Sequence, residues 1–249
     1  MKTTFYRLEC LTNLHVGSSE ESYSIVDNEV EKDAVTGYPI IHASGLKGAV
    51  RATFAAEEAD RLFGHGRDSF EHAGLYKFLD AQLLARPLRV AGSSELASLP
   101  VVTVASVNRF LQLLTVFGDN PYGLAAIPTP DFGDADFLTN VDEPLEVEGE
   151  RTNKLTAADA EAWAPIAELL GGRFAIARNF DAYPLPVVAR NFLNDGRLNF
   201  VWYEEMVPQG TVMFFAVIAP DDAEPVVPEL LQVGAHASIG CGYVRITAL

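Results

Sequence analysis

The sequence predicts an α+β fold of the ferredoxin-like kind, in which helices cover a β-sheet. Two observations support this class. Segments with strand and helix patterns follow one another as strand, helix, strands, helix and then strands separated by short helices. The chain also has no internal repeat and no clean linker. We therefore expect a single domain over residues 1–249, with insertions at about 17–33, 119–152 and 178–200.

The first third of the chain opens with a predicted strand. Residues 3–12 alternate in side-chain character, as a strand with one buried face does. The apolar positions on that face are Tyr6, Leu8 and Cys10. Residues 17–33 are polar and rich in Ser and Glu, which predicts a loop. Ser44 is then the expected N-cap of a helix that runs to about Leu62.

The middle of the chain predicts a hairpin or one long bent strand over residues 75–90. Thr103 then caps a second helix that ends at Gly118. Its expected buried side consists of Val107, Phe110, Leu111, Leu114 and Phe117. Residues 119–149 read as loop. Because residues 131–150 hold eight acidic side chains and no basic one, we expect a solvated surface excursion there.

The last third is predominantly strand. Thr156 opens a third helix with a capping-box pattern, and Pro165 is expected to kink it. A short helix is expected near residues 228–232. The predicted strands are Leu185–Phe192, Leu198–Tyr203, Thr211–Ala219 and Cys241–Thr247.

Composition excludes several protein classes. Hydrophobic residues make up 49% and charged residues 21%, as in a globular protein with a substantial core. No run of about 18 apolar residues occurs, so we expect no membrane-spanning helix. Arg7 and Glu9 interrupt the apolar stretch that a signal peptide requires, and the two cysteines indicate no disulfide framework. The expected compartment is the cytoplasm.

The net charge of −16 argues against non-specific nucleic-acid binding, which draws on Lys and Arg at phosphates. The chain has 18 Lys and Arg residues against 34 Asp and Glu residues. A salt-adapted or GC-rich genome would produce the same acidic, lysine-poor composition. Net charge does not decide the fold, and a local basic groove is compatible with an acidic protein.

The helix that Ser44 opens has the features of a phosphate site. Lys47 and Arg51 are four residues apart and so share one helix face. A helix N-terminus offers free N–H groups and partial positive charge to a phosphate. Gly45 and Gly48 carry no side chain that would hold a bound backbone away. The same pattern also describes a capped amphipathic helix with solvated cations.

Several segments, in the same order along nearly the whole chain, resemble the repeating backbone subunit of type III-B (Cmr) CRISPR effectors, within the RAMP superfamily. The helix start Ser44–Arg51 is close to that family's S-x-L-K-G-x-x-R pattern, which type III-A complexes share. The other matching segments are Leu14–Gly17, Ile25–Asp27, Thr36–Ile41, Asp80–Arg89, Leu185–Asn191, Trp202–Pro208, Leu231–Gly234 and Ile239–Val244. The chain departs from the family at residues 28–33, where relatives carry an Arg-containing strand.

The resemblance implies a fold and a function. It implies a ferredoxin-like/RRM-like RAMP core with inserted loops and a projecting thumb hairpin. It also implies a subunit that binds crRNA and cleaves complementary target RNA with Mg²⁺ or another divalent cation. Its expected partners are crRNA, target RNA, further copies of itself and other type III effector subunits, without a membrane. The alternatives are a non-catalytic crRNA-binding scaffold and the equivalent type III-A subunit.

The resemblance also implies site residues. Asp27 is the expected catalytic and metal-binding carboxylate, although a loop Asp can instead be a turn residue. His15 is either an acid–base group or a ring that hydrogen-bonds backbone at a strand end. Glu205 is either near the cleavage centre or a structural carboxylate. The expected RNA-binding residues are Ser44, Gly45, Lys47, Gly48, Arg51, Arg190, Asn191, Arg197, Gly240 and Gly242.

Residues 183–196 form either the family's thumb or a core hairpin. Asn194, Asp195 and Gly196 are the expected turn. In the resembled family the thumb enters the guide–target duplex and displaces a base pair at regular intervals. Phe192 and Leu193 are the candidates for such an apolar wedge.

Overall fold

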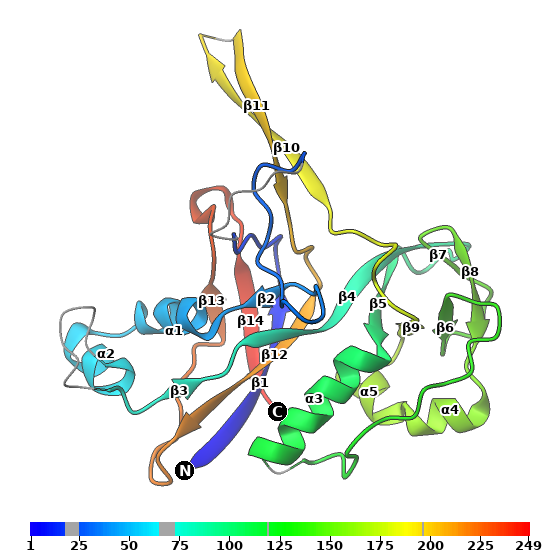
Figure 1. The fold of residues 1–249 in the computed structure, drawn as a ribbon, viewed down its shortest axis with the longest axis horizontal. Coiled ribbons are helices and arrows are strands. Elements are labelled where there is room, and N and C mark those ends of the chain that lie inside the picture. The colour runs from blue at the N-terminus through cyan, green and yellow to red at the C-terminus, as the bar shows by residue number, and fades with distance from the viewer. Residues whose placement is uncertain (18–24, 65–72, 119, 196) are drawn as a thin grey trace. The chain divides into compact units, whose positions relative to one another are not determined.

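The computed structural model describes residues 1–17, 25–64, 73–118, 120–195 and 197–249, and for Leu193 the backbone alone (Figure 1). The chain forms two compact units. The first combines Met1–Leu83, Leu185–Gln209 and Met213–Leu249, and the second combines Leu84–Pro184 with Gly210–Val212. The mixture of helices with a β-rich core agrees with the predicted α+β class.

The sheet of the first unit brings the two ends of the chain together. Strand β1 (Lys2–Cys10) pairs antiparallel with β14 (Tyr243–Ala248), so that Tyr6 lies opposite Ala248. Figure 1 shows these strands, blue and red, side by side. The other strands of this sheet are β13 (Leu230–Gln232) beside β14, β12 (Val212–Ala219) beside β1, β3 (Lys77–Phe78) beside β12, and β2 (Ile40–Ile41) beside the start of β4 (Ala81–Ala91).

The core of the first unit follows the predicted alternation. Tyr6, Leu8 and Cys10 are all buried, in a cluster with Leu46 and Val50 of the first helix. Burying these apolar groups is the main term that stabilises the unit. Residues 228–232, predicted as a helix, instead contain β13, and the nearby helical turn is the 3₁₀ segment η1 (Ala237–Ile239).

The helix predicted from Ser44 to Leu62 is two helices, α1 (Ala43–Arg51) and α2 (Ala56–Phe63). It breaks after Arg51 because the Thr53 amide and hydroxyl both donate to the carbonyl of Val50. The N-cap of α1 is His42 and not Ser44 as predicted. The His42 side chain makes no capping hydrogen bond. The Asp80 carboxylate takes that role and accepts a hydrogen bond from the Ala43 amide at 2.7 Å.

The predicted hairpin forms from β10 (Val187–Asn194) and β11 (Arg197–Glu205), paired antiparallel. Asn194 pairs with Arg197, which leaves a two-residue turn in which Asp195 has a φ of 48°. The predicted turn residue Gly196 lies outside the described residues. Figure 1 shows the hairpin extending away from the sheet of its own unit. The described side chains of its outer part are exposed, so this part is not a core hairpin.

The second unit contains the best-predicted helix, α3 (Val104–Phe117), which follows β5 (Ser98–Thr103). Thr103 caps the helix and Gly118 ends it, both as predicted, and Ser106 completes a reciprocal capping box that was not predicted. Phe117 was expected on the buried side but is exposed, because it lies in the last turn, beyond the part of the helix that packs.

The segment predicted as loop at residues 119–149, which includes most of the acidic stretch, is not a plain loop over its described residues 120–149. It contains β6 (Phe137–Thr139) and β7 (Glu146–Val147), which pair with β9 (Ala175–Ala177) and β8 (Glu150–Lys154). Phe137 and Val147 are buried, while the acidic side chains lie exposed or half-buried. The expectation of solvated acids is therefore confirmed, and the expectation of a surface excursion is wrong.

Thr156 caps the next helix, α4 (Ala157–Ala162), and accepts a hydrogen bond from the Asp159 amide. The helix direction breaks at Trp163, and α5 (Ala164–Leu169) begins with Pro165 in its first turn. The predicted helix start at Thr156 and the predicted break at Pro165 are confirmed, since proline fits the first turn of a helix but not its interior, while only the Thr156 half of the predicted capping box forms. Within the described residues, no helix is long and apolar enough to cross a membrane.

Candidate functional site

Asp27 lies at the base of the hairpin, on the outer edge of β11. Its amide donates to the carbonyl of Tyr203 at 3.0 Å, and its Oδ2 accepts a hydrogen bond from the Tyr203 amide at 2.8 Å. The next residue continues the pairing, because the Glu205 amide donates to the Asn28 carbonyl at 2.9 Å. The segment predicted as a polar loop is therefore pinned to the hairpin where the candidate carboxylate sits.

The Asp27 carboxylate is exposed, and its second oxygen accepts no hydrogen bond from the described residues. The described part of the chain also holds no cluster of three or more His, Cys, Asp or Glu side chains suited to a metal ion. Asp27 alone can offer one carboxylate oxygen to a cation. This donor set fits an Mg²⁺ ion only when phosphate oxygens and water supply the remaining ligands, as is common for Mg²⁺.

Glu204, the neighbour of Tyr203, is the buried hub of the same region. Its carboxylate accepts hydrogen bonds from Trp202 Nε1 at 2.8 Å and Asn28 Nδ2 at 3.2 Å. It also pairs with the Arg190 guanidinium and lies 3.0 Å from His236 Nε2. Four segments distant in sequence or on opposite strands thus meet at one buried acid.

The pKa of Glu204 lies below its usual range. Burial works in the opposite direction and raises this pKa, but the hydrogen bonds from Trp202 and Arg190 and the charges of His236 and Arg190 outweigh it. Glu204 is consequently an anion with its acceptor sites occupied. A buried carboxylate with these contacts is suited to position Arg190, Trp202 and His236, and not to accept a proton from a substrate.

Glu205 and His15 are also engaged inside the fold. Glu205 is buried, with its carboxylate 3.0 Å from Lys32 Nζ and 3.2 Å from the Val30 amide. His15 is buried, and its Nδ1 lies 2.8 Å from the Glu205 carbonyl oxygen. Because a carbonyl only accepts, Nδ1 carries the hydrogen. Of the two roles expected for His15, this geometry is that of the ring that bonds backbone at a strand end.

The predicted RNA-binding residues of the hairpin have different environments. Arg190 is half-buried in its ion pair with Glu204, whereas Asn191 and Arg197 are exposed. On the face that carries Arg190, Phe192 lies opposite Phe200, and both rings are about half exposed, at 50% and 57%. Phe200 also contacts Trp202, with ring centroids 5.2 Å apart. The side chain of Leu193 lies outside the described residues.

The predicted phosphate-binding face of α1 is bare. Ser44, Gly45 and Gly48 are exposed, and a Cβ added at either glycine would meet nothing within 4 Å. Glycine inside a helix is less stable than alanine by roughly 0.5–1 kcal/mol, and nothing in the fold requires it here. Lys47 is half-buried beside this face, while Arg51 forms an ion pair with Asp60. Of the two cations that the sequence placed on one helix face, Arg51 is therefore already paired with a carboxylate, and Lys47 forms no ion pair within the described residues.

The two glycines of the C-terminal loop have different explanations. Gly240 has a φ of 83° and ends η1, with open space around the position of a Cβ. Gly242 has a φ of 81°, and a Cβ there would lie 2.0 Å from the carbonyl oxygen of Val233. Gly242 is therefore required by the fold itself. Only Gly240 leaves backbone accessible to a ligand.

Sequence reasoning missed the cluster around Glu204. The sequence pointed to Glu205 and to the segment Trp202–Pro208, but not to His236 or Asn28. Two adjacent acids in a strand point to opposite faces. On a strand with one buried face, one of the two is therefore expected in solvent. That both are buried depends on partners from distant segments, which no local pattern shows.

Comparison with known proteins gives the family and the fold. A model of the RAMP superfamily matches residues 7–245. The chain is 26% identical over 287 residues to the CRISPR system Cmr endoribonuclease Cmr4 of Pyrococcus furiosus, which covers 99% of this chain and 96% of that protein. It is 32% identical over 117 residues to the Cms endoribonuclease Csm3 of Streptococcus thermophilus, covering 41% of this chain and 49% of that protein.

Two solved structures share the fold. A chain in the cryo-EM structure of a type III-B Cmr-beta complex bound to cognate target RNA matches 100% of this chain and 97% of its own length, with a TM-score of 0.77 and 19% identity. The crystal structure of oligomeric Cmr4 from Pyrococcus furiosus matches 100% of this chain and 98% of its own, with a TM-score of 0.74 and 21% identity. At these identities the likeness establishes the fold alone.

Proposed function

This chain belongs to the RAMP superfamily, and from that membership we propose that it is a repeating backbone subunit of a type III-B CRISPR effector. In this role it binds crRNA and cleaves the target RNA paired to it. The observation that carries the proposal is Asp27 at the base of an extended hairpin, where one hydrogen bond to its exposed carboxylate and one from its amide hold it against Tyr203. The similarity to Cmr4 over 99% of the chain, against 41% for Csm3, favours type III-B over III-A.

The crRNA-binding part of the proposal rests on α1. The bare face at Gly45 and Gly48 lets a sugar–phosphate backbone approach the helix closely, although Asp80 already accepts from the amide of Ala43 at the helix start. Lys47 lies beside this face as the cation for a phosphate. Arg51 is already paired with Asp60 and contributes less. A local cationic site of this kind is compatible with RNA binding by a chain whose net charge is −16.

The cleavage part rests on Asp27 as a proton acceptor. The ribose 2′-oxygen of the target attacks the adjacent phosphorus, and Asp27 accepts the proton that this oxygen loses. The bond from phosphorus to the 5′-oxygen breaks and this oxygen takes a proton from water, which leaves a 2′,3′-cyclic phosphate and a 5′-hydroxyl. The Tyr203 amide holds Asp27 Oδ2, so that the other carboxylate oxygen faces the RNA.

A divalent cation is part of the proposal. Mg²⁺ supplies charge stabilisation at the phosphate when it is bound. The open oxygen of Asp27 would either ligate this cation, together with phosphate oxygens of the RNA, or accept the ribose proton, because one oxygen does not do both at once. Glu204 and Glu205 are not available for this role, because Arg190, Trp202 and Lys32 occupy their carboxylates.

The hairpin is proposed as the thumb. Phe192 and Phe200 form an exposed cross-strand aromatic pair near its outer end. Apolar side chains inserted between bases unstack them, so this pair is the wedge that displaces a base pair. The exposed Arg197 beside the turn can meet a phosphate of the strand that the wedge opens.

The proposal is tested directly with the purified chain and a synthetic crRNA. We expect bound RNA to raise the ratio of absorbance at 260 nm to that at 280 nm, and light scattering to show several copies stacking head-to-tail along one RNA. RNA complementary to the guide should be cut and non-complementary RNA should not. A chain that stays monomeric and free of RNA at low salt would exclude the proposal.

The two exposed glycines of α1 allow a test in which stability and binding move in opposite directions. Gly48→Ala should stabilise the chain by roughly 0.5–1 kcal/mol, because its Cβ enters open space in a helix. It should weaken crRNA binding on the order of tenfold, by holding the RNA away from the helix. Urea unfolding and filter binding measure the two effects. If the variant is more stable and binds equally well, the bare face does not contact RNA.

A further inference from the structure

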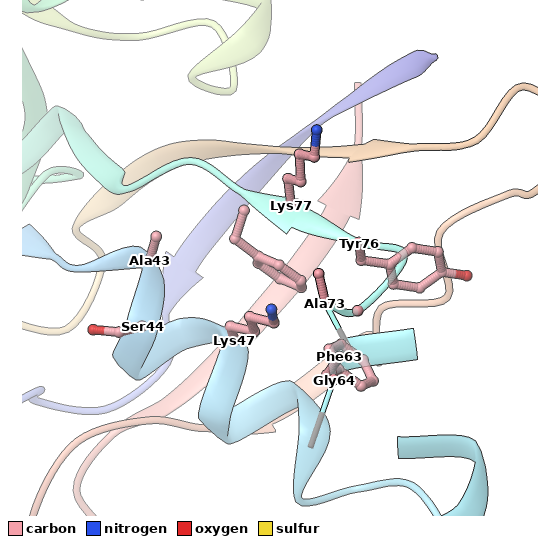
Figure 2. Close-up of a pocket in the computed structure, with 10 residues that line it drawn as sticks. Ala43, Ser44, Lys47, Phe63, Gly64, Ala73, Tyr76 and Lys77 are labelled. Atoms are coloured by element: carbon pink, nitrogen blue, oxygen red, sulfur yellow. The ribbon is translucent and has the colours of Figure 1, made fainter. Parts of the chain in front are cut away.

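A pocket of about 470 Å³ opens beside the first turn of α1. Figure 2 shows Lys47 reaching toward it from α1, and Lys77 on the far side, on β3. Phe63 and Gly64, at the end of α2, close it on a third side (Figure 2). The volume lies within the range of roughly 300–1,000 Å³ that is usual for sites that bind small organic molecules.

The pocket has a rigid aromatic wall. Phe63 meets Tyr76 edge-on at 5.7 Å and lies 6.1 Å from Phe78, between ring centroids. The Tyr76 hydroxyl donates to the carbonyl of Glu224 at 3.1 Å, which fixes that ring. A Cβ at Gly74 would lie 2.2 Å from the Phe63 carbonyl carbon, so only glycine permits this close approach. The wall is thus set by the fold before any ligand arrives.

The charge of the pocket is positive in an acidic protein. Several cations of the described residues lie against carboxylates: Lys2, Lys32, Arg51, Arg89, Lys154, Arg173 and Arg190. Within the described ranges neither Lys47 nor Lys77 forms an ion pair, and Lys77 Nζ has only a weak contact, 3.9 Å from Met1 Sδ. Burial and then the charge of Arg51 lower the pKa of Lys47. An anion bound beside Lys47 would favour its charged form and so raise this pKa again.

We propose that this pocket receives one nucleotide of the RNA strand that lies along α1. Lys47 binds its phosphate, the exposed side chain of Lys77 swings in from the rim as a second cation, and the base packs against Phe78. Aromatic rings accept any base by stacking, and lysines beside them hold the backbone, which is the usual construction of single-strand sites. The inference rests on the proposed function and adds Lys77 and the aromatic wall to the RNA-binding surface.

The test uses the full chain and a single-stranded RNA that carries one 5-iodouridine. We expect irradiation to join the RNA to the peptide at residues 73–78. Lys47→Ala and Lys77→Ala should each reduce affinity about threefold to tenfold at moderate salt, and each should reduce the slope of log affinity against log salt by about 0.7. Lys154→Ala makes the same change in net charge at an exposed lysine of the other unit and should have neither effect.

Phe78→Leu separates stacking from charge. It keeps an apolar side chain at Phe78, so the salt slope should be unchanged, while the photo-crosslink should fall at least fivefold. Adenosine 5′-monophosphate at millimolar concentration should compete for the crosslink, and inorganic phosphate at equal ionic strength should not. Equal competition by phosphate would indicate a simple anion site and overturn the inference.

The outcomes distinguish this inference from the proposed function. If the unmodified chain binds no RNA, the proposed function fails. If it binds RNA but Lys77→Ala behaves as Lys154→Ala does and no crosslink maps to residues 73–78, the pocket is not used and the proposed function stands.

Discussion

Replacing Asp27 with Asn should reduce target cleavage by about 10²-fold or more while the complex still assembles. Asn retains an oxygen that can accept the hydrogen bond from the Tyr203 amide, so the segment stays pinned to β11. The change removes the negative charge and replaces the open oxygen with an NH₂ group. Neither proton acceptance from the ribose nor ligation of a cation is then supported. The measurement is single-turnover cleavage of guide-complementary RNA.

The matched control is Asp222→Asn, which removes the same charge from an exposed position of the same unit. It should cut at the unmodified rate. Removing divalent ions with a chelator should reproduce the defect in the unmodified complex. If Asp27→Asn cuts as fast as the control, Asp27 is a residue that only pins the loop, and the group required for cleavage lies elsewhere.

Elements with local signals were predicted from the sequence, and elements with distant partners were not. Thr103, Ser106 and Gly118 encode both ends of α3 within the helix itself. The start of α1 depends instead on Asp80, 37 residues from the amide that it caps. Strands β6 and β7 are only three and two residues long and lie among acids, so their pairing partners define them more than their own pattern does.

The same distinction applies to the candidate site. Asp27, Lys47 and the hairpin turn could be named from segments that resemble a family, because each lies within a short pattern. The anchor of Asp27 is Tyr203, 176 residues away, and no pattern around either residue shows the contact. Arg51 was grouped with Lys47 by helical spacing, yet Asp60 on the next helix neutralises it. Sequence spacing places side chains on a face but does not show which charges are already paired.

Replacing Glu204 with Gln should lower the free energy of unfolding of the first unit by about 3–5 kcal/mol. The carboxylate accepts from Trp202 and Asn28 and pairs with Arg190 and His236. Gln offers one accepting oxygen, turns an NH₂ group toward donors and leaves the half-buried Arg190 without its counter-charge. Urea unfolding followed by circular dichroism measures the loss. Glu224→Gln makes the same change in an exposed pair with Lys2 and should cost less than about 1 kcal/mol.

The pH dependence of that loss follows from the lowered pKa of Glu204. A carboxyl group whose pKa is lower in the folded state than in the unfolded chain stabilises the fold above its ordinary value of 4.5. This contribution disappears as the pH falls from that value through the folded pKa, where Glu204 becomes protonated and resembles Gln. The difference between the two proteins should therefore be full near pH 7 and shrink below about pH 4.5. A difference that stays constant down to acid pH would mean that shape, rather than charge, makes Glu204 necessary.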